Sequence, residues 1–170
     1  MSGPVGNIMR AERPGPVQME LFVSDKILPP VYFLSAIILA VLLHFLLPMW
    51  KLVHYPWLLF GLIPFSTGIV FNLLADQTFK KYDTTVKPFE RSEVLVTSGV
   101  FRVSRNPMYL GMQLILVGIA VMLGSLAPFV IVVVMAVIFD RKFIVPEERM
   151  LADRFGLEFR QYCRRVRKWI

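Results

Sequence analysis

The sequence predicts an all-α integral membrane protein with about four transmembrane helices, a cytoplasmic loop and an amphipathic C-terminal helix. Four apolar blocks, at 27–47, 57–75, 108–123 and 126–139, carry almost no charged residues, and a helix of about 20 apolar residues spans a bilayer. Hydrophobic residues make up 56% of the chain, with a mean hydropathy of +0.60, which exceeds the apolar share of soluble domains. A soluble bundle of buried helices is the minor alternative.

The chain is expected to divide into an N-terminal arm, 1–26, and a membrane domain, 27–170. The arm contains charged residues and three prolines and lacks the apolar core of a signal peptide. Prolines open and close the first span. The second span, 57–75, contains Gly61 and Gly68, and small residues of this kind let membrane helices approach closely.

The distribution of basic residues predicts the orientation. Nine of the 19 Lys and Arg lie in 141–170, six in 80–107 and three in the arm, whereas the connection 48–56 has only Lys51. Because cytoplasmic segments carry the excess of Lys and Arg, both termini and the 80–107 loop are predicted to be cytoplasmic. Anionic lipid headgroups are the nearest partners of such a tail, so nucleic acid is not an expected partner.

The fourth apolar run is too short for a full crossing. Residues 126–139 give ~21 Å of helix against a hydrocarbon core of ~30 Å. The helix is therefore expected to continue through 140–142 toward Glu147, which favours a recessed polar pocket. Snorkelling of Arg141 and Lys142 to the interface is an equal alternative.

After Pro146, apolar residues at three- and four-residue spacing predict an amphipathic helix lying on the membrane surface. These residues are Leu151, Phe155, Phe159, Tyr162, Val166 and Trp169.

The candidate site is a motif in two parts. Residues 105–111 (RNPMYLG) and the pair Glu147-Glu148 are separated by two apolar runs with a break at 124–125. A membrane hairpin would return the acidic pair to the face that the first part occupies. Carboxylates bind cations, ammonium groups and ribose hydroxyls, and arginine binds carboxylates. With Tyr109 these groups suit a zwitterionic ligand with a sugar and a positive centre, although solvated helix ends would give the same pattern.

Other chemistries find little support in the sequence. There is no GxGxxG or P-loop spacing. Cys163 is the only cysteine, and His44 and His54 have no further ligands at suitable spacing, so no metal site is predicted. Asn72 and Asp76 share one helical face near the cytoplasmic end of the second span, where helix-end solvation is the simpler explanation for the aspartate.

Several motifs, in the right order, resemble the isoprenylcysteine carboxyl methyltransferase family, which is related to membrane phospholipid methyltransferases. The resemblance covers about 84–170, half of the chain. It implies a multi-span enzyme that binds S-adenosylmethionine without a Rossmann fold, in a pocket formed by the loop, the hairpin and the C-terminal segment. The matching residues are 95–99 (LVTSG), 104–111 (SRNPMYLG), Glu147, Glu148, Leu151, 155–156, Tyr162 and Val166.

The resemblance also implies roles for individual residues. The cofactor would be lined on one side by the loop and held from the other side by Glu147. Arg141 is the nearest match to a family arginine that faces the substrate carboxylate, and Glu148 and Arg154 are candidates for orienting the substrate. The implied cofactor-binding residues are Glu93, Val94, Leu95, Val96, Phe101, Arg105, Asn106, Pro107, Met108, Tyr109, Gly111 and Glu147.

The chain departs from the family pattern at three of these positions. Asn106 stands where the family often has His, Glu93 where it often has His or Gln, and Phe101 where Tyr is common. Asparagine keeps hydrogen bonds but does not titrate near neutrality. These departures leave a variant cofactor site and place methylation of prenylated protein C-termini in doubt.

The sequence thus predicts an integral-membrane methyltransferase that uses S-adenosylmethionine and acts on a small amphiphilic acceptor from the bilayer. A carboxylate, as in isoprenylcysteine methylation, is one candidate acceptor. The alternatives are methylation of a phospholipid or other amine, a non-catalytic lipid-binding protein of the same fold, and a reductase with a nicotinamide cofactor.

Overall fold

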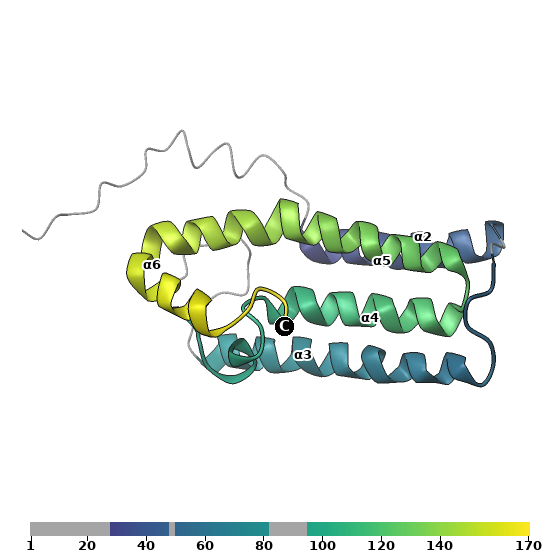
Figure 1. Ribbon diagram of the computed structural model, residues 1–170, viewed down its shortest axis with the longest axis horizontal. Helices are drawn as coiled ribbons and strands as arrows, with labels where there is room; N and C mark the ends of the chain where they lie inside the picture. The colour runs from purple at the N-terminus through teal and green to yellow at the C-terminus, as the bar shows by residue number, and fades with distance from the viewer. Residues whose placement is uncertain (1–27, 48–49, 82–94) are drawn as a thin grey trace, which may run out of the picture.

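The described part of the chain is almost entirely helical (Figure 1). A computed structural model describes residues 28–47, 50–81 and 95–170, so the N-terminal arm and residues 82–94 lie outside it. Within these ranges there is no strand, only an isolated bridge between Lys51 and Ser125. The elements are α2 (Pro29–Leu46), η1 (Trp57–Gly61), α3 (Leu62–Lys81), η2 (Gly99–Arg102), α4 (Pro107–Leu123), α5 (Leu126–Ile138), the π-helix η3 (Phe139–Ile144) and α6 (Val145–Arg165).

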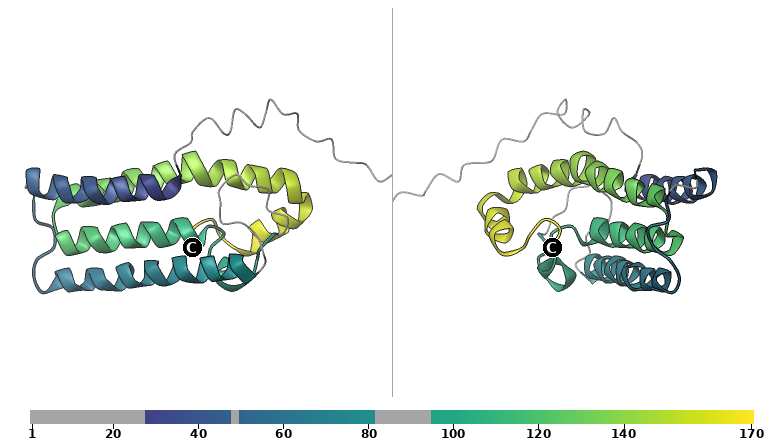
Figure 2. Two further views of the ribbon diagram at one scale, coloured as in Figure 1. Left: turned by 180° about the vertical axis from the view of Figure 1, so that it is seen from behind. Right: turned by 45° about the vertical axis from the view of Figure 1, so that its right-hand side comes forward.

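The helices form a bundle in which α4 is central. It packs against α2, α3 and α5, while α2 also packs against α5 (Figures 1 and 2). The buried residues between α2, α4, α5 and η3 form the main core. They include Ala36, Ala40, Tyr109, Met112, Leu116, Ile131, Met135, Phe139, Phe143 and Ile144.

The contact between α3 and α4 is a seam of glycines. Gly61 faces Gly118, and Gly68 faces Gly111. A Cβ atom on Gly61 would lie 2.6 Å from the carbonyl oxygen of Gly118, and one on Gly111 would lie 2.8 Å from that of Gly68. Both distances are too short for a real side chain, so the two backbones touch directly, as the small residues of the second span predict.

Two helices are long and apolar enough to cross a membrane, Pro29–Leu46 and Trp57–Lys80, and only 17% of each is buried within the protein. Their outward faces expose large apolar side chains such as Leu34, Ile38, Ile63 and Leu73. An apolar surface of this extent is typical of contact with a membrane or with another protein rather than with water. The helix Pro107–Leu123 is apolar but shorter, and α5 has 13 residues, so the four-span topology stays a prediction.

The fourth apolar run does continue as a helix, as predicted. From Leu126 the chain passes through α5 and η3 into the first half of α6 without leaving helical structure. The π-helical turn, which contains Asp140, Arg141 and Lys142, is not indicated by the sequence pattern. The helix then bends at Gly156, whose φ of +50° suits glycine, and the second half of α6 folds back toward the bundle (Figure 1).

The apolar stripe of α6 faces the protein, which corrects the predicted position on a membrane surface. Phe159, Tyr162 and Val166 are buried together, with Leu95 and Leu151 packed against them. Burial within the protein therefore accounts for most of the stripe.

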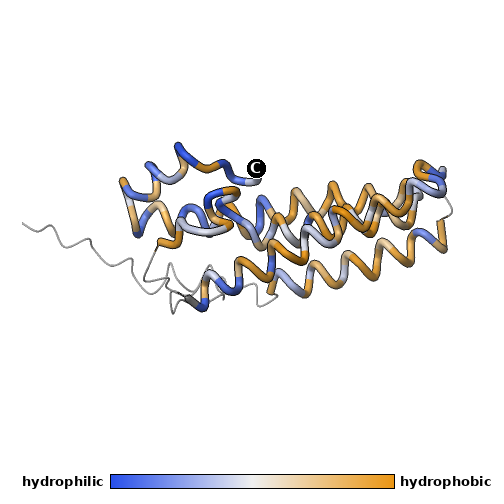
Figure 3. Tube along the Cα trace, turned by 90° about the horizontal axis from the view of Figure 1, so that it is seen from below, coloured by the Kyte–Doolittle hydropathy of each residue, from blue (hydrophilic) through white to orange (hydrophobic). Residues whose placement is uncertain are grey.

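The two ends of the bundle differ in polarity. The loop at residues 50–53 and the turn at Gly124 and Ser125 close one end through backbone hydrogen bonds, and His44 Nδ1 lies 2.7 Å from Ser125 Oγ. The other end gathers η2, η3, α6 and the C-terminus, where hydrophilic residues are concentrated (Figure 3). The described parts of the basic loop and tail thus lie at one end, as the charge distribution predicts.

Candidate functional site

The α4–α5 hairpin brings the two parts of the sequence motif together. Tyr109 Oη donates a hydrogen bond to Glu147 Oε1 at 2.6 Å. Arg105 Nε and Nη2 donate to the two carboxylate oxygens of Glu148, at 2.9 Å and 3.2 Å. The predicted return of the acidic pair to the start of α4 is therefore confirmed.

The guanidinium of Arg105 also holds the end of the chain. Its Nη1 donates to the carbonyl oxygens of Val166, at 2.9 Å, and Cys163, at 3.3 Å. The Arg105 amide donates to the carbonyl oxygen of Arg167 at 3.1 Å. Only 12% of the Arg105 side chain and 17% of the Glu148 side chain are exposed. Water therefore competes weakly for the hydrogen bonds between the guanidinium and the carboxylate, and this charged pair binds more strongly than it would on an open surface. Residues 163–168 are called the strap below.

Asn106 and Ser104 bind the same strap. Asn106 Nδ2 donates to Glu148 Oε1 and to the carbonyl oxygen of Lys168, both at 3.2 Å. Ser104 Oγ donates to that carbonyl at 3.2 Å and accepts the Asn106 amide hydrogen at 3.1 Å. Both residues are buried, so every one of these polar groups gains from having a partner.

Tyr109 and Glu147 lie on the apolar side of this network. The Tyr109 ring packs against Phe139 and Phe143 of the π-helix, with ring centroids 5.6 Å and 6.1 Å apart. Both phenylalanines are almost fully buried. Glu147 therefore meets a hydroxyl donor beside an aromatic wall, whereas Glu148 meets a guanidinium.

The setting of Glu147 changes its acidity. Burial raises the pKa of this carboxyl to about 7, the hydrogen bond from Tyr109 opposes the rise, and the neighbouring Glu148 carboxylate adds to it. A carboxyl with such a pKa changes between its neutral and ionised forms near neutral pH, which suits a group that binds a cation or accepts a proton.

The π-helix contributes two further polar contacts. Asp140 Oδ1 accepts a hydrogen bond from Lys168 Nζ at 3.0 Å, which ties the strap to the start of η3. Lys142 Nζ donates to Tyr32 Oη and lies 4.9 Å from the centre of the Tyr32 ring. Both lysines are only partly exposed, so the charges at this depth do have partners, as the recessed-pocket prediction requires.

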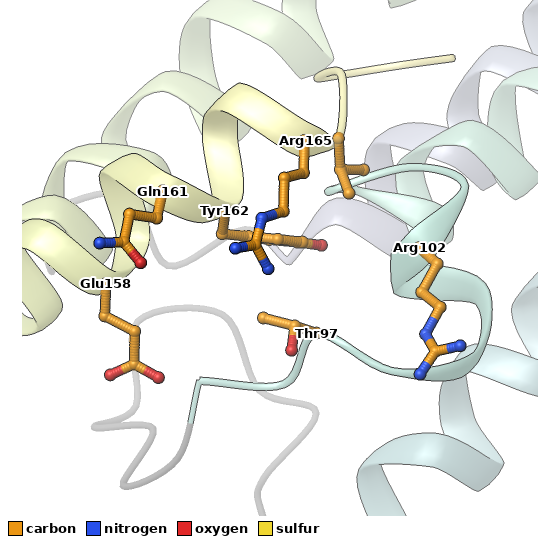
Figure 4. Close-up of a pocket in the computed structure, with 7 residues that line it drawn as sticks. Thr97, Arg102, Glu158, Gln161, Tyr162 and Arg165 are labelled. Carbon is orange, nitrogen blue, oxygen red and sulfur yellow. The ribbon is translucent and has the colours of Figure 1, made fainter.

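A cavity of about 600 Å³ lies between the segment 95–102 and the second half of α6 (Figure 4). Arg165 and Tyr162 of α6 face Thr97 and Arg102 across it. Its lining combines basic, acidic, amide and hydroxyl groups. The lining residues are Thr97, Arg102, Glu158, Gln161, Tyr162, Arg165 and Val166.

Comparison with known proteins identifies the family. The model of the phospholipid methyltransferase family matches residues 56–158. The chain belongs to the phospholipid methyltransferase family. An uncharacterized protein of Haemophilus influenzae is 33% identical over 63 residues, which are 37% of this chain and all of that protein.

A solved structure supports the family fold. It is that of the eukaryotic intramembrane Ras methyltransferase ICMT, isoprenylcysteine carboxyl methyltransferase, with 25% identity and a TM-score of 0.63. The match covers 83% of this chain and 51% of that one, so this chain spans about half the length of that enzyme. The resemblance inferred from the motifs is thereby confirmed.

The predicted cofactor-binding residues in the described part of the loop are packed against the rest of the protein. Val96 and Phe101 are buried, and Leu95 packs against the α6 cluster. The carbonyl oxygen of Phe101 accepts a hydrogen bond from Tyr162 Oη at 2.6 Å. Phe101 thus holds α6 through its backbone, which needs no side-chain hydroxyl.

Other predicted residues lie around the start of α4 or outside the described residues. Pro107 is buried in the first turn of α4, Met108 follows it half-buried, and Gly111 faces α3 at the glycine seam. Glu93 and Val94 lie outside the described residues.

Two residues predicted to orient the substrate lie apart from the cluster. The Arg141 side chain is 83% exposed, with Nε 3.9 Å from Asp140 Oδ2. Arg154 is exposed and lies over the ring of Phe155, 5.7 Å from its centre. The structure brings neither of them to Glu147 or Glu148.

Sequence reasoning missed the strap and the cavity. The strap contributes backbone carbonyl groups, which leave no trace in residue type. The charge pattern groups Lys168 with the lipid-facing basic residues, although it bonds Asp140. Glu158 and Gln161 lie on α6 one turn apart, a spacing that signals a shared polar face but does not indicate that a cavity lies beside it.

Proposed function

We propose that this protein is an integral-membrane methyltransferase that uses S-adenosylmethionine to methylate a small amphiphilic acceptor from the bilayer. The observation that carries the proposal is the Glu147–Tyr109 pair in a chain of this family. Among the described residues Glu147 forms no salt bridge, so its carboxylate stays available to a positively charged ligand. It lies where the apolar helices meet the polar end of the bundle, which is where an amphiphile presents its head.

The residues present fit the proposed cofactor. S-adenosylmethionine supplies a methyl group on a positively charged sulfur, together with a carboxylate, an ammonium group and a ribose. Arg102 and Arg165 of the cavity suit the carboxylate, and Glu158 and Gln161 suit the ammonium or the ribose hydroxyls. A cavity of about 600 Å³ is of the size that small-molecule sites commonly have.

The protein's task in such a reaction is alignment. Because the methyl group is already activated, the side chains need to hold the acceptor in line with the methyl carbon and exclude water. The aromatic wall of Phe139 and Phe143 excludes water on one side of Tyr109. A bound S-adenosylmethionine would supply the methyl group, and its sulfur would keep the electron pair of the broken carbon–sulfur bond.

An amine headgroup is the acceptor that the site favours over a carboxylate. A neutral amine forms an ammonium on methylation and must lose a proton before or after the transfer, and Glu147, with a pKa raised to about 7 by burial, suits a proton acceptor. A carboxylate acceptor needs a basic partner, and Arg141 is exposed beside Asp140. Carboxyl methylation, the activity for which the solved relative is named, remains the second candidate.

Binding and transfer are tested on the purified protein in detergent. Calorimetry with S-adenosylmethionine should give a saturable signal, and a labelled methyl group should appear in a lipid extract. Glu147→Gln should remove both, while Asp153→Asn, the same kind of change at an exposed position on α6, should remove neither. No binding at millimolar cofactor would overturn the proposal. Binding without transfer to any lipid would favour the non-catalytic alternative.

A further inference from the structure

The hydrogen-bonding capacity of Arg105 is nearly all used within the chain. A guanidinium has five N–H donors. Four hydrogen bonds leave its side chain, two to Glu148 and two to the strap carbonyls of Cys163 and Val166. Little capacity remains to bind the carboxylate of a cofactor or substrate.

Asn106 is used in the same way. Its side-chain amide has two N–H donors, and they go to Glu148 and to the carbonyl of Lys168. Both partners can only accept hydrogen bonds, so the side-chain nitrogen of Asn106, and not its side-chain oxygen, must face them. A neutral histidine, with one N–H, would not make both bonds from one atom.

The strap held by these residues is also a wall of the cavity. Arg165 and Val166 of the strap line that space, and the Val166 carbonyl is one of the groups that Arg105 binds. Farther along, Lys168 bonds Asp140 and Trp169 packs against the main core. The strap therefore connects the cavity, the acidic pair and the π-helix.

We infer that Arg105, Asn106 and Glu148 form a clamp that positions the strap, and that Glu147 alone of the acidic pair faces the ligand. The inference rests on the proposed function and assigns different tasks to two adjacent carboxylates. Glu148, Arg105 and Asn106 are positioning residues, which act on the cofactor through the wall that they hold.

The first experiment measures the strap itself. Arg105, Arg164, Arg165, Arg167 and Lys168 are trypsin sites, and four of them lie in the strap. Trypsin cleavage of the detergent-solubilised protein, followed by intact mass, should be about 10- to 100-fold faster after Glu148→Gln or Arg105→Lys, because charge-assisted hydrogen bonds are lost. Glu147→Gln should leave the cleavage rate of the strap unchanged.

The second experiment separates positioning from contact. Arg105→Lys and Glu148→Gln should raise the KM for S-adenosylmethionine about tenfold and leave the pH profile of kcat as it is. Glu147→Gln should instead remove cofactor binding and, with it, measurable transfer. Unchanged strap cleavage in Glu148→Gln, together with lost cofactor binding, would overturn the inference because Glu148 would then contact the ligand directly.

A charge exchange provides a further check. In the double variant Arg105→Glu with Glu148→Arg, a simple ion pair would be restored. The new carboxylate at position 105 would face the carbonyl oxygens of Cys163 and Val166, so strap cleavage should stay fast. Recovery of wild-type cleavage would contradict the clamp. If the wild-type protein binds no S-adenosylmethionine, the proposed function fails, whereas the cleavage rates still report whether the clamp exists.

Discussion

Two contact regions hold α4 in place, and they do so by different means. On one side, the glycine seam with α3 fits backbone against backbone and contains no charge. On the other, the clamp joins the start of α4 to the strap through charged and neutral hydrogen bonds. Shape complementarity is insensitive to pH and salt, whereas the clamp and the neighbouring Glu147 depend on ionisation. The seam should therefore be unaffected by conditions that change the site.

The seam should give the largest effect when broken. Gly68→Val places a side chain against the backbone of Gly111 and against Ile115 one turn along, and overpacking of this kind costs about 1–3 kcal/mol and occasionally more. Thermal unfolding in detergent should show a large loss of stability or no folded protein. Thr67→Val, on the adjacent exposed position, is the matched control and should stay near wild type. A well-folded Gly68→Val protein would contradict the seam.

Glu147→Gln should give the next largest effect, and it sharpens the contrast because it should raise stability while removing function. The pKa of Glu147 is raised to about 7 by burial from an ordinary value of 4.5. The folded state therefore prefers the neutral form, so the contribution of Glu147 to stability is full below about pH 4.5 and is lost as the pH rises toward 7. At pH 8 the cost is no more than about 3 kcal/mol.

Glu147→Gln should therefore be more stable than wild type at pH 8 and about equal at pH 4.5. Denaturation followed at both pH values checks this. In the wild type, cofactor binding should weaken below pH 7 as the carboxylate becomes protonated. A variant that is less stable than wild type at pH 8 would show that ionised Glu147 is stabilised by the protein.

A smaller effect is expected from the departure at Asn106. Asn106→His replaces two N–H donors on one atom by a single one at pH 8, which should cost about 1 kcal/mol and make strap cleavage several-fold faster. Lowering the pH to 6 adds a second N–H to the imidazole. Trypsin cleavage compared at the two pH values, with wild type alongside, measures both effects. Equal cleavage of the variant and the wild type at pH 8 would show that the second bond is dispensable.

The smallest effect should come from the Lys168–Asp140 pair. Its side chains are 31% and 26% exposed, and partly exposed ion pairs contribute about 0–1 kcal/mol. Lys168→Met should leave the stability of the bundle, measured by thermal unfolding, within that range. The backbone carbonyl that Asn106 and Ser104 bind is still present in this variant, so the strap should remain resistant to trypsin.

Sequence reasoning recovers the parts of this molecule that depend on side-chain type and period. The short fourth apolar run correctly predicts a helix that continues to Glu147, and the hairpin correctly brings Glu147 and Glu148 to the start of α4. The apolar stripe at Phe159 and Tyr162 is also predicted. Its partner is not, because periodicity shows which face is apolar but not whether lipid or protein covers it.

The rest is hidden from the sequence for physical reasons. The strap is held by the carbonyl groups of residues such as Val166 and Lys168, and every residue type has a carbonyl. The bend at Gly156 has a sequence signal, a glycine within a helical pattern, but its direction depends on tertiary packing. The clamp role of Arg105 depends on how many of its donors are occupied, which only the folded arrangement reveals.

The π-helix between α5 and α6 sets the direction in which the two glutamates point. A π-turn closes its hydrogen bond over one residue more than an α-turn, and each residue turns an α-helix by about 100°. If η3 kept its residues but wound as an α-helix, everything beyond it would therefore rotate by about that angle. Glu147 would leave Tyr109, and Glu148 would leave Arg105. The distinction between a ligand-facing and a structural carboxylate thus depends on the geometry of η3 as well as on the two glutamates themselves.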